Sequence, residues 1–77
     1  MERTLNQIAK EIRMNWTKVN YGAEPYLDAM SSLNSIHDKY YMDDAKSIVL
    51  YFLSNAGTWK GDKAKEIKAE LKQMLNN

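Results

Sequence analysis

The residues best suited to chemistry in this chain are its single histidine and three nearby aspartates, His37, Asp38, Asp43 and Asp44. Imidazole and carboxylate groups together can hold a metal ion or transfer a proton. Their spacing matches no established ligand motif, and the alternating Asp/Asn ligands and terminal Glu of a calcium loop are missing. The simpler interpretation is a polar loop in which Asp43 or Asp44 caps the following helix. We therefore expect no metal site and no cofactor.

The sequence contains few residues suited to nucleophilic catalysis. The chain contains no cysteine, and His37 is the only imidazole that could activate a serine. A chain of 77 residues also has little room for a pocket of ligand size. We therefore expect a protein that is not an enzyme.

A lysine-rich segment near the C-terminus could contact nucleic-acid phosphates. Its members are Lys60, Lys63, Lys65, Lys68 and Lys72. Three of these lysines recur at helical spacing, and the acidic residues Asp62, Glu66 and Glu70 are expected on the opposite flank. Mixed charge of this kind is typical of a solvated surface helix, and a net charge of +1 argues mildly against a nucleic-acid partner. We therefore expect Lys68 to lie in solvent, where its removal would change stability little.

The last two predicted helices are joined by a short turn that contains glycine. A helix-turn-helix that places the last helix in the major groove is therefore an alternative. On the exposed face of that helix, Gln73 is the only side chain of the kind that reads base edges well. An ordinary helical hairpin is the simpler interpretation, so nucleic-acid binding through the lysine-rich side is the second hypothesis.

Aromatic residues are numerous, with five tyrosines and two tryptophans. Either the tyrosines line the edge of the core, or some of them form a contact surface, since exposed Tyr and Trp are enriched at protein interfaces. Trp16 falls on an apolar helical stripe and is predicted to be structural. Trp59 lies between Gly57 and Gly61, which predicts an exposed turn. The predicted contact residues are Trp59, Lys60, Tyr40, Tyr41 and Tyr51.

The periodicity of apolar residues predicts the elements that position these side chains. Helices are expected over residues 5–18, 24–33, 45–55 and 63–75. Thr4 and Gln7 have the spacing of a capping box, and Pro25 suits the first turn of the second helix. Residues 35–42 are expected to be irregular.

The third predicted helix is the most apolar segment of the chain. Its apolar residues cover a wide arc that includes Ile48, Phe52 and Leu50, which is typical of a helix touched on several sides. A strand over residues 47–53 is the competing interpretation, because the segment has high β propensity. We favour the helix, since no second convincing strand is present to pair with it.

Length and composition limit the remaining choices. A chain of 77 residues is expected to form a single helical domain over residues 1–77, and without cysteine it forms no disulfide. Because so small a core stabilises a fold only modestly, a homodimer is one way of completing it. No apolar run approaches the roughly 20 residues of a membrane span, and no signal peptide is evident. We expect a cytoplasmic protein.

Two segments carry a resemblance to a known group of proteins. Residues 25–30 read PYLDAM and residues 51–61 read YFLSNAGTWKG, and a lysine-rich helix follows. From about Trp16 onward the chain resembles the small uncharacterised proteins that phages and integrated mobile elements encode. The resemblance implies a cytoplasmic, non-enzymatic accessory protein, and it assigns no site residue.

The sequence as a whole predicts an all-α fold, a compact bundle of four short helices with a central apolar third helix. The leading functional hypothesis is a small accessory protein that binds or regulates another protein, whose identity the sequence does not reveal. A homodimer is one form of this hypothesis, and nucleic-acid binding is the alternative.

Overall fold

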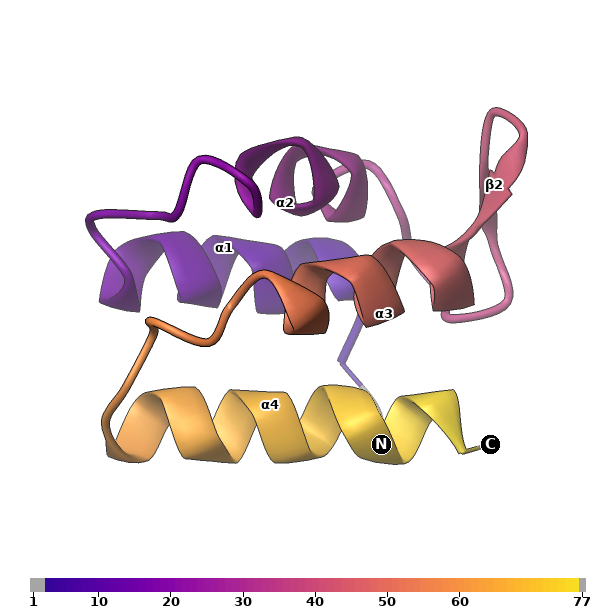
Figure 1. Ribbon diagram of the computed structural model, residues 1–77. Coiled ribbons are helices and arrows are strands. Elements are labelled where there is room, and N and C mark those ends of the chain that lie inside the picture. Colours follow the sequence, from indigo (N-terminus) through magenta and orange to yellow (C-terminus); the bar gives the residue numbers. More distant parts are fainter. Residues whose placement is uncertain (1–2, 77) are drawn as a thin grey trace.

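The computed structural model describes residues 3–76, so positions 1–2 and 77 of the predicted domain lie outside the described residues. Along this part of the chain the helices and strands follow in the order α1 Leu5–Asn15, α2 Glu24–Met30, β1 Lys39–Tyr40, β2 Asp43–Asp44, α3 Ala45–Ser54 and α4 Asp62–Leu75 (Figure 1). The prediction of a mainly helical, compact fold is confirmed. The short strand pair was missed, because it falls in residues 35–42 and the cap of α3, where only irregular structure was expected.

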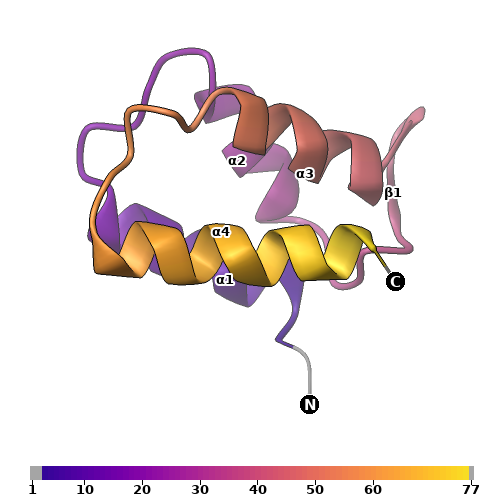
Figure 2. The same cartoon turned by 60° about the horizontal axis from the view of Figure 1, so that its bottom comes forward.

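The helices form two layers. In Figure 2, α1 and α4 lie together on one side of the molecule while α2 and α3 lie on the other. The helix α3 packs against α2 within its own layer and against α4 in the other, and α1 likewise contacts α2 and α4. This arrangement encloses a single apolar core between the layers.

The start of α1 is held by the capping box that the sequence predicted. The Thr4 hydroxyl accepts the Gln7 backbone N–H at 3.2 Å, and the Gln7 side-chain oxygen accepts the Thr4 N–H at 3.0 Å. The next two backbone donors, from Leu5 and Asn6, reach carbonyls in the loop after α2 at 2.9 Å. Local capping thus also ties the first helix to the second, since those carbonyls belong to residues 33 and 34.

A two-residue turn joins the strands β1 and β2. The strands are antiparallel, with Tyr40 opposite Asp43 and Lys39 opposite Asp44. Tyr41, at the turn, has a backbone φ of +57°, a value that bulky side chains rarely adopt. Asp44 then caps α3, because its carboxylate accepts the Ser47 N–H at 2.8 Å. The hairpin therefore leads directly into the third helix.

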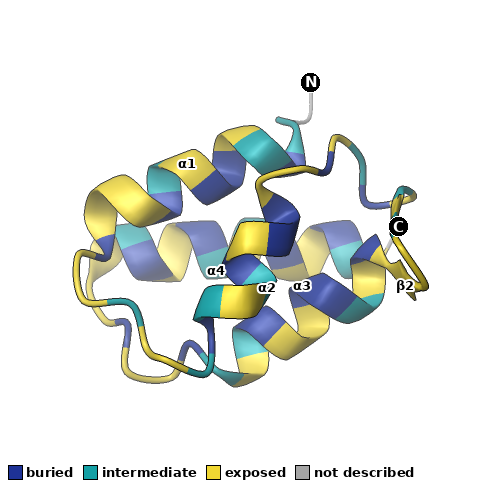
Figure 3. Cartoon of the chain, turned by 90° about the horizontal axis from the view of Figure 1, so that it is seen from above, coloured by how far each residue is buried: buried dark blue, intermediate teal, exposed yellow. Residues whose placement is uncertain are grey.

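The predicted burial of the third helix is correct on one side only. Ile48, Val49 and Phe52 are buried, whereas Leu50 is 54% exposed and Tyr51 is 52% exposed. Buried and exposed residues alternate along α3 in Figure 3, as on an amphipathic helix. The expectation that Leu50 joins the core is wrong, because neighbouring helices do not cover that side of α3.

Among the described residues, no helix combines the length and apolar character needed to cross a membrane.

Candidate functional site

Trp59, predicted to be an exposed contact residue, lies in the core. Its side chain is 4% exposed and stacks on Trp16, with ring centroids 5.5 Å apart and an angle of 9° between the planes. The turn folds inward because the Trp59 backbone N–H donates to the Ala56 carbonyl at 3.1 Å. The prediction of exposure is wrong, since a large ring next to a turn gains more by burial than by facing water.

Lys68 also differs from the prediction of a solvated side chain. Its Nζ donates a hydrogen bond to the Trp59 carbonyl at 2.7 Å and lies 6.0 Å from the centroid of the Trp59 ring. Partial burial lowers the pKa of Lys68, and repulsion from Lys60 and Lys72 lowers it further. This lysine therefore stabilises the turn that buries Trp59.

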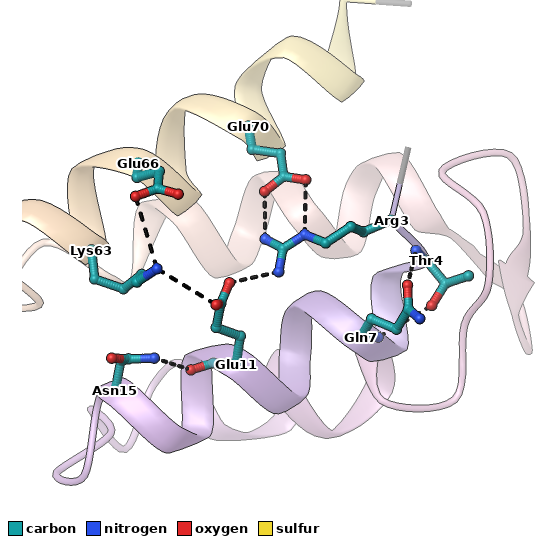
Figure 4. Close-up of polar contacts among 8 residues, drawn as sticks. All are labelled: Arg3, Thr4, Gln7, Glu11, Asn15, Lys63, Glu66 and Glu70. Atoms are coloured by element: carbon teal, nitrogen blue, oxygen red, sulfur yellow. Dashed lines mark hydrogen bonds and ion pairs between the residues drawn. The ribbon is translucent and has the colours of Figure 1, made fainter. Parts of the chain in front are cut away.

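Lys63 is separated from the other lysines and points towards α1. Its Nζ lies 3.6 Å from a Glu11 oxygen and 3.9 Å from a Glu66 oxygen. Arg3 completes this network, because its guanidinium contacts Glu11 at 2.6 Å and Glu70 at 2.5 Å (Figure 4). The network joins α1 to α4 and holds Lys63 apart from Lys60, Lys65 and Lys68, so the five lysines do not form one patch, a question that the sequence left open.

Three of the predicted lysines do come together at the start of α4. Lys60, Lys65 and Lys68 line a pocket of about 320 Å³, together with Trp59, Gly61, Asp62 and Ala64. Lys72 is close enough to Lys68 to affect its pKa. Asp62 was expected on the acidic flank and instead lines the same pocket. We call this site the lysine pocket. It is lined by Lys60, Lys65 and Lys68 but not by Lys63.

A second pocket lies between α2, the hairpin and α3. It has a volume of about 420 Å³ and is lined by Pro25, Tyr26, Ala29, Tyr40, Asp43, Ile48 and Tyr51. We call it the tyrosine pocket. The Tyr26 and Tyr51 rings are in contact, with centroids 5.5 Å apart. Two of the predicted contact residues, Tyr40 and Tyr51, therefore share one concave site.

The turn of the hairpin adds exposed side chains beside this pocket. Tyr41 is 87% exposed and Met42 is 98% exposed. The Tyr41 ring meets the Tyr40 ring edge to face, with centroids 4.7 Å apart. We call Tyr26, Tyr40, Tyr41, Met42 and Tyr51 the hairpin surface.

The five predicted contact residues do not form one surface. Tyr40, Tyr41 and Tyr51 gather at the hairpin, Trp59 is in the core, and Lys60 lines the lysine pocket. The hairpin and the turn before α4 are at opposite ends of the molecule (Figures 1 and 2). Tyr26 and Met42 were not among the predicted contact residues. The one sequence feature that pointed to Tyr26 was its position beside Pro25, at the start of α2.

Two of the three aspartates near His37 accept backbone N–H groups, whereas the third, Asp43, lines the tyrosine pocket. Asp38 accepts the backbone N–H groups of Asn34 at 2.9 Å and of Ser35 at 3.0 Å, and these bonds lower the pKa of its carboxyl group. Asp44 caps α3 in the same way. Within residues 3–76, no three histidine, aspartate or glutamate side chains gather closely enough to hold a metal ion.

Comparisons of the chain with protein-family models, with curated proteins and with solved structures found no match. The resemblance to phage and mobile-element proteins accordingly stays an expectation.

Proposed function

We propose that this protein binds another protein through the hairpin surface and acts as a non-enzymatic accessory protein. The observation that carries the proposal is the exposure of Tyr41 and Met42 directly beside a pocket lined by three tyrosines. Tyrosine and methionine are enriched at interfaces, where a few aromatic anchors supply most of the binding energy. The proposal includes a cytoplasmic location and an origin in a phage or mobile element, as the resemblance implies.

The backbone of Tyr41 gives the proposal further support. A φ of +57° suits glycine, and a bulky residue there costs about 1–3 kcal/mol. Residues in such conformations cluster at functional sites. The tyrosine places a large ring at the end of the hairpin, where it adds little to the core because it is 87% exposed. A partner that packs on this ring accounts for its presence.

Site-specific photo-cross-linking in the organism that encodes the chain tests this proposal. A photoreactive phenylalanine analogue replaces Tyr41 in one variant, Tyr51 in a second and the exposed Gln73 of α4 in a third. We expect one discrete cross-linked product at positions 41 and 51 that is absent at position 73. Mass spectrometry of the product identifies the partner, and a cross-link to a second copy would identify a homodimer. Equal products at all three positions, or none at positions 41 and 51, would contradict the proposal.

Nucleic-acid binding is the second candidate function, and the lysine pocket is the observation that favours it. Lys60, Lys65 and Lys68 line one pocket, and Lys72 is near Lys68. Binding through these lysines should weaken steeply with salt, because phosphate contacts release counterions. Titration of a fluorescent duplex and a single strand at about 50 mM salt and at higher salt tests this. Absence of binding at the lower salt excludes this function.

A further inference from the structure

The side chains that line the tyrosine pocket are neutral or negatively charged. Among the described residues that line it are three tyrosines and the carboxylate of Asp43, and none is a lysine, arginine or histidine. The face of an aromatic ring carries negative potential and attracts a cation within about 6 Å of its centroid. We propose that this pocket binds the guanidinium group of an arginine side chain on the partner. This inference rests on the protein-binding function proposed above.

The register of the hairpin explains why Asp43 is the carboxylate in the pocket. Tyr40 and Asp43 are directly opposite each other across the strand pair, so their side chains lie on the same face of the hairpin. Lys39 and Asp44 form the neighbouring pair, which projects from the other face. Asp44 is further occupied as the cap of α3. The hairpin therefore presents an aromatic ring and a negative charge together, and keeps its lysine away from them.

The opposite wall and the floor of the pocket come from the helices. Tyr26 of α2 and Tyr51 of α3 meet at 5.5 Å with an angle of 34° between their rings. Ile48 and Ala29, which are 3% and 4% exposed, also line the pocket. Apolar atoms here can cover the methylene groups of a long cationic side chain while its charged end meets the rings and the carboxylate.

A guanidinium group fits this lining better than an ammonium group. It is planar, stacks on aromatic faces, binds a carboxylate through two parallel N–H groups and is weakly hydrated. The ammonium of lysine is compact and strongly hydrated, so it gains less from three aromatic rings. Two nearby carboxylates on α2, Glu24 and Asp28, already pair with Arg13 of this chain. Asp43 is thus the acidic group that the pocket offers to an incoming arginine.

Titration of the labelled full chain with blocked amino acids, followed by NMR, tests the inference. The probes are N-acetyl-arginine methylamide, its uncharged citrulline counterpart and the equivalent lysine compound. We expect the arginine probe to shift the resonances of Asp43 and the three pocket tyrosines saturably in the millimolar range. The citrulline and lysine probes should bind at least about 3-fold more weakly, since the first lacks the charge and the second lacks the planar donor pair.

Two variants and one control assign the interaction to the pocket. Asp43→Asn and Tyr51→Leu should each weaken binding of the arginine probe by about 3–5-fold, because each removes one attraction to the cation at a partly exposed site. Asp62→Asn, an exposed aspartate at the opposite end of the molecule, should leave binding unchanged. The same spectra report whether each variant keeps its fold.

The outcomes separate this inference from the function on which it rests. Binding of the citrulline or the lysine probe as tight as that of the arginine probe, or no shifts at about 50 mM probe, would overturn the arginine assignment. If cross-linking at position 41 is intact in that case, the protein-binding function stands. If the arginine probe binds but no cross-linked partner forms at positions 41 and 51, the protein-binding function fails and the pocket is left as a cation site alone.

Discussion

Trp16 and Trp59 stack face to face, with their planes only 9° apart, although 42 positions separate them in the sequence. The stack joins the end of α1 to the turn between α3 and α4. Trp16 also meets Phe52 of α3 edge to face at 6.2 Å. The end of α1, the helix α3 and the turn before α4 therefore pack together through these three rings. The turn that was predicted to be a contact surface instead contributes to the core.

Replacement of Trp59 by alanine should lower the free energy of unfolding by about 3–5 kcal/mol, the range for large aromatic side chains lost from a core. Chemical denaturation monitored by circular dichroism measures it. Tyr21→Ala is the matched control, because Tyr21 is 92% exposed and its loss should cost under about 0.5 kcal/mol. Equal effects of the two substitutions would show that Trp59 is not in the core.

Lys68→Ala should destabilise the protein by about 1–3 kcal/mol. It removes a hydrogen bond to the Trp59 carbonyl and a cation near the Trp59 ring, each worth about 0.5–1.5 kcal/mol. Lys65→Ala, on the same helix and exposed, should change stability by less than about 0.5 kcal/mol. Thermal melts of the two variants make the comparison. A melting temperature for Lys68→Ala that matches the Lys65→Ala value would restore the original expectation of a solvated lysine.

Tyr41→Gly should change the free energy of unfolding by an amount between a loss of about 0.5 kcal/mol and a gain of about 2.5 kcal/mol. Glycine relieves the left-handed backbone, which costs about 1–3 kcal/mol, and the lost contact with Tyr40 offsets about 0.5–1.5 kcal/mol of this gain. Denaturation gives the stability of the variant, and its affinity for a partner found by cross-linking gives the functional effect. We expect that affinity to fall at least about 10-fold, as for an interface anchor. Destabilisation together with unchanged affinity would mean that Tyr41 has a structural role.

Stability should decline as the pH falls below about 4. The Ser47 N–H group lowers the pKa of Asp44 from its usual 3.8, and the Arg3 guanidinium lowers the pKa of Glu11 from its usual 4.5. Because the folded pKa is the lower one, each carboxylate stabilises the fold fully above its unfolded pKa and loses that effect as the pH falls through the folded value. Melting temperatures between about pH 2 and 7 measure the decline. The double variant Asp44→Asn with Glu11→Gln should show a flatter profile, and an identical profile would contradict the assignment.

Local features of this protein could be predicted from the sequence because they depend on neighbours within a few residues. The capping box of Thr4 and Gln7 was recognisable, and the cap of α3 was narrowed to Asp43 or Asp44, since each cap joins groups only three positions apart. The periodicity that buries Ile48 and Phe52 was equally visible, because a helix repeats every 3.6 residues. The predicted first helix nevertheless extended to residue 18, whereas α1 ends at Asn15.

The functional surfaces depended on contacts between residues far apart in the chain. Trp59 is buried because it stacks on Trp16. Lys63 lies apart from the other lysines because it pairs with Glu11. Likewise, Tyr26, Tyr40 and Tyr51 lie far apart in the sequence but line one pocket. Residue types and local spacing determined the helices and their caps. Only the packing of two helical layers and a hairpin decided which side chains became a core, a salt-bridge network or a binding site, because burial is set by the elements that cover a residue.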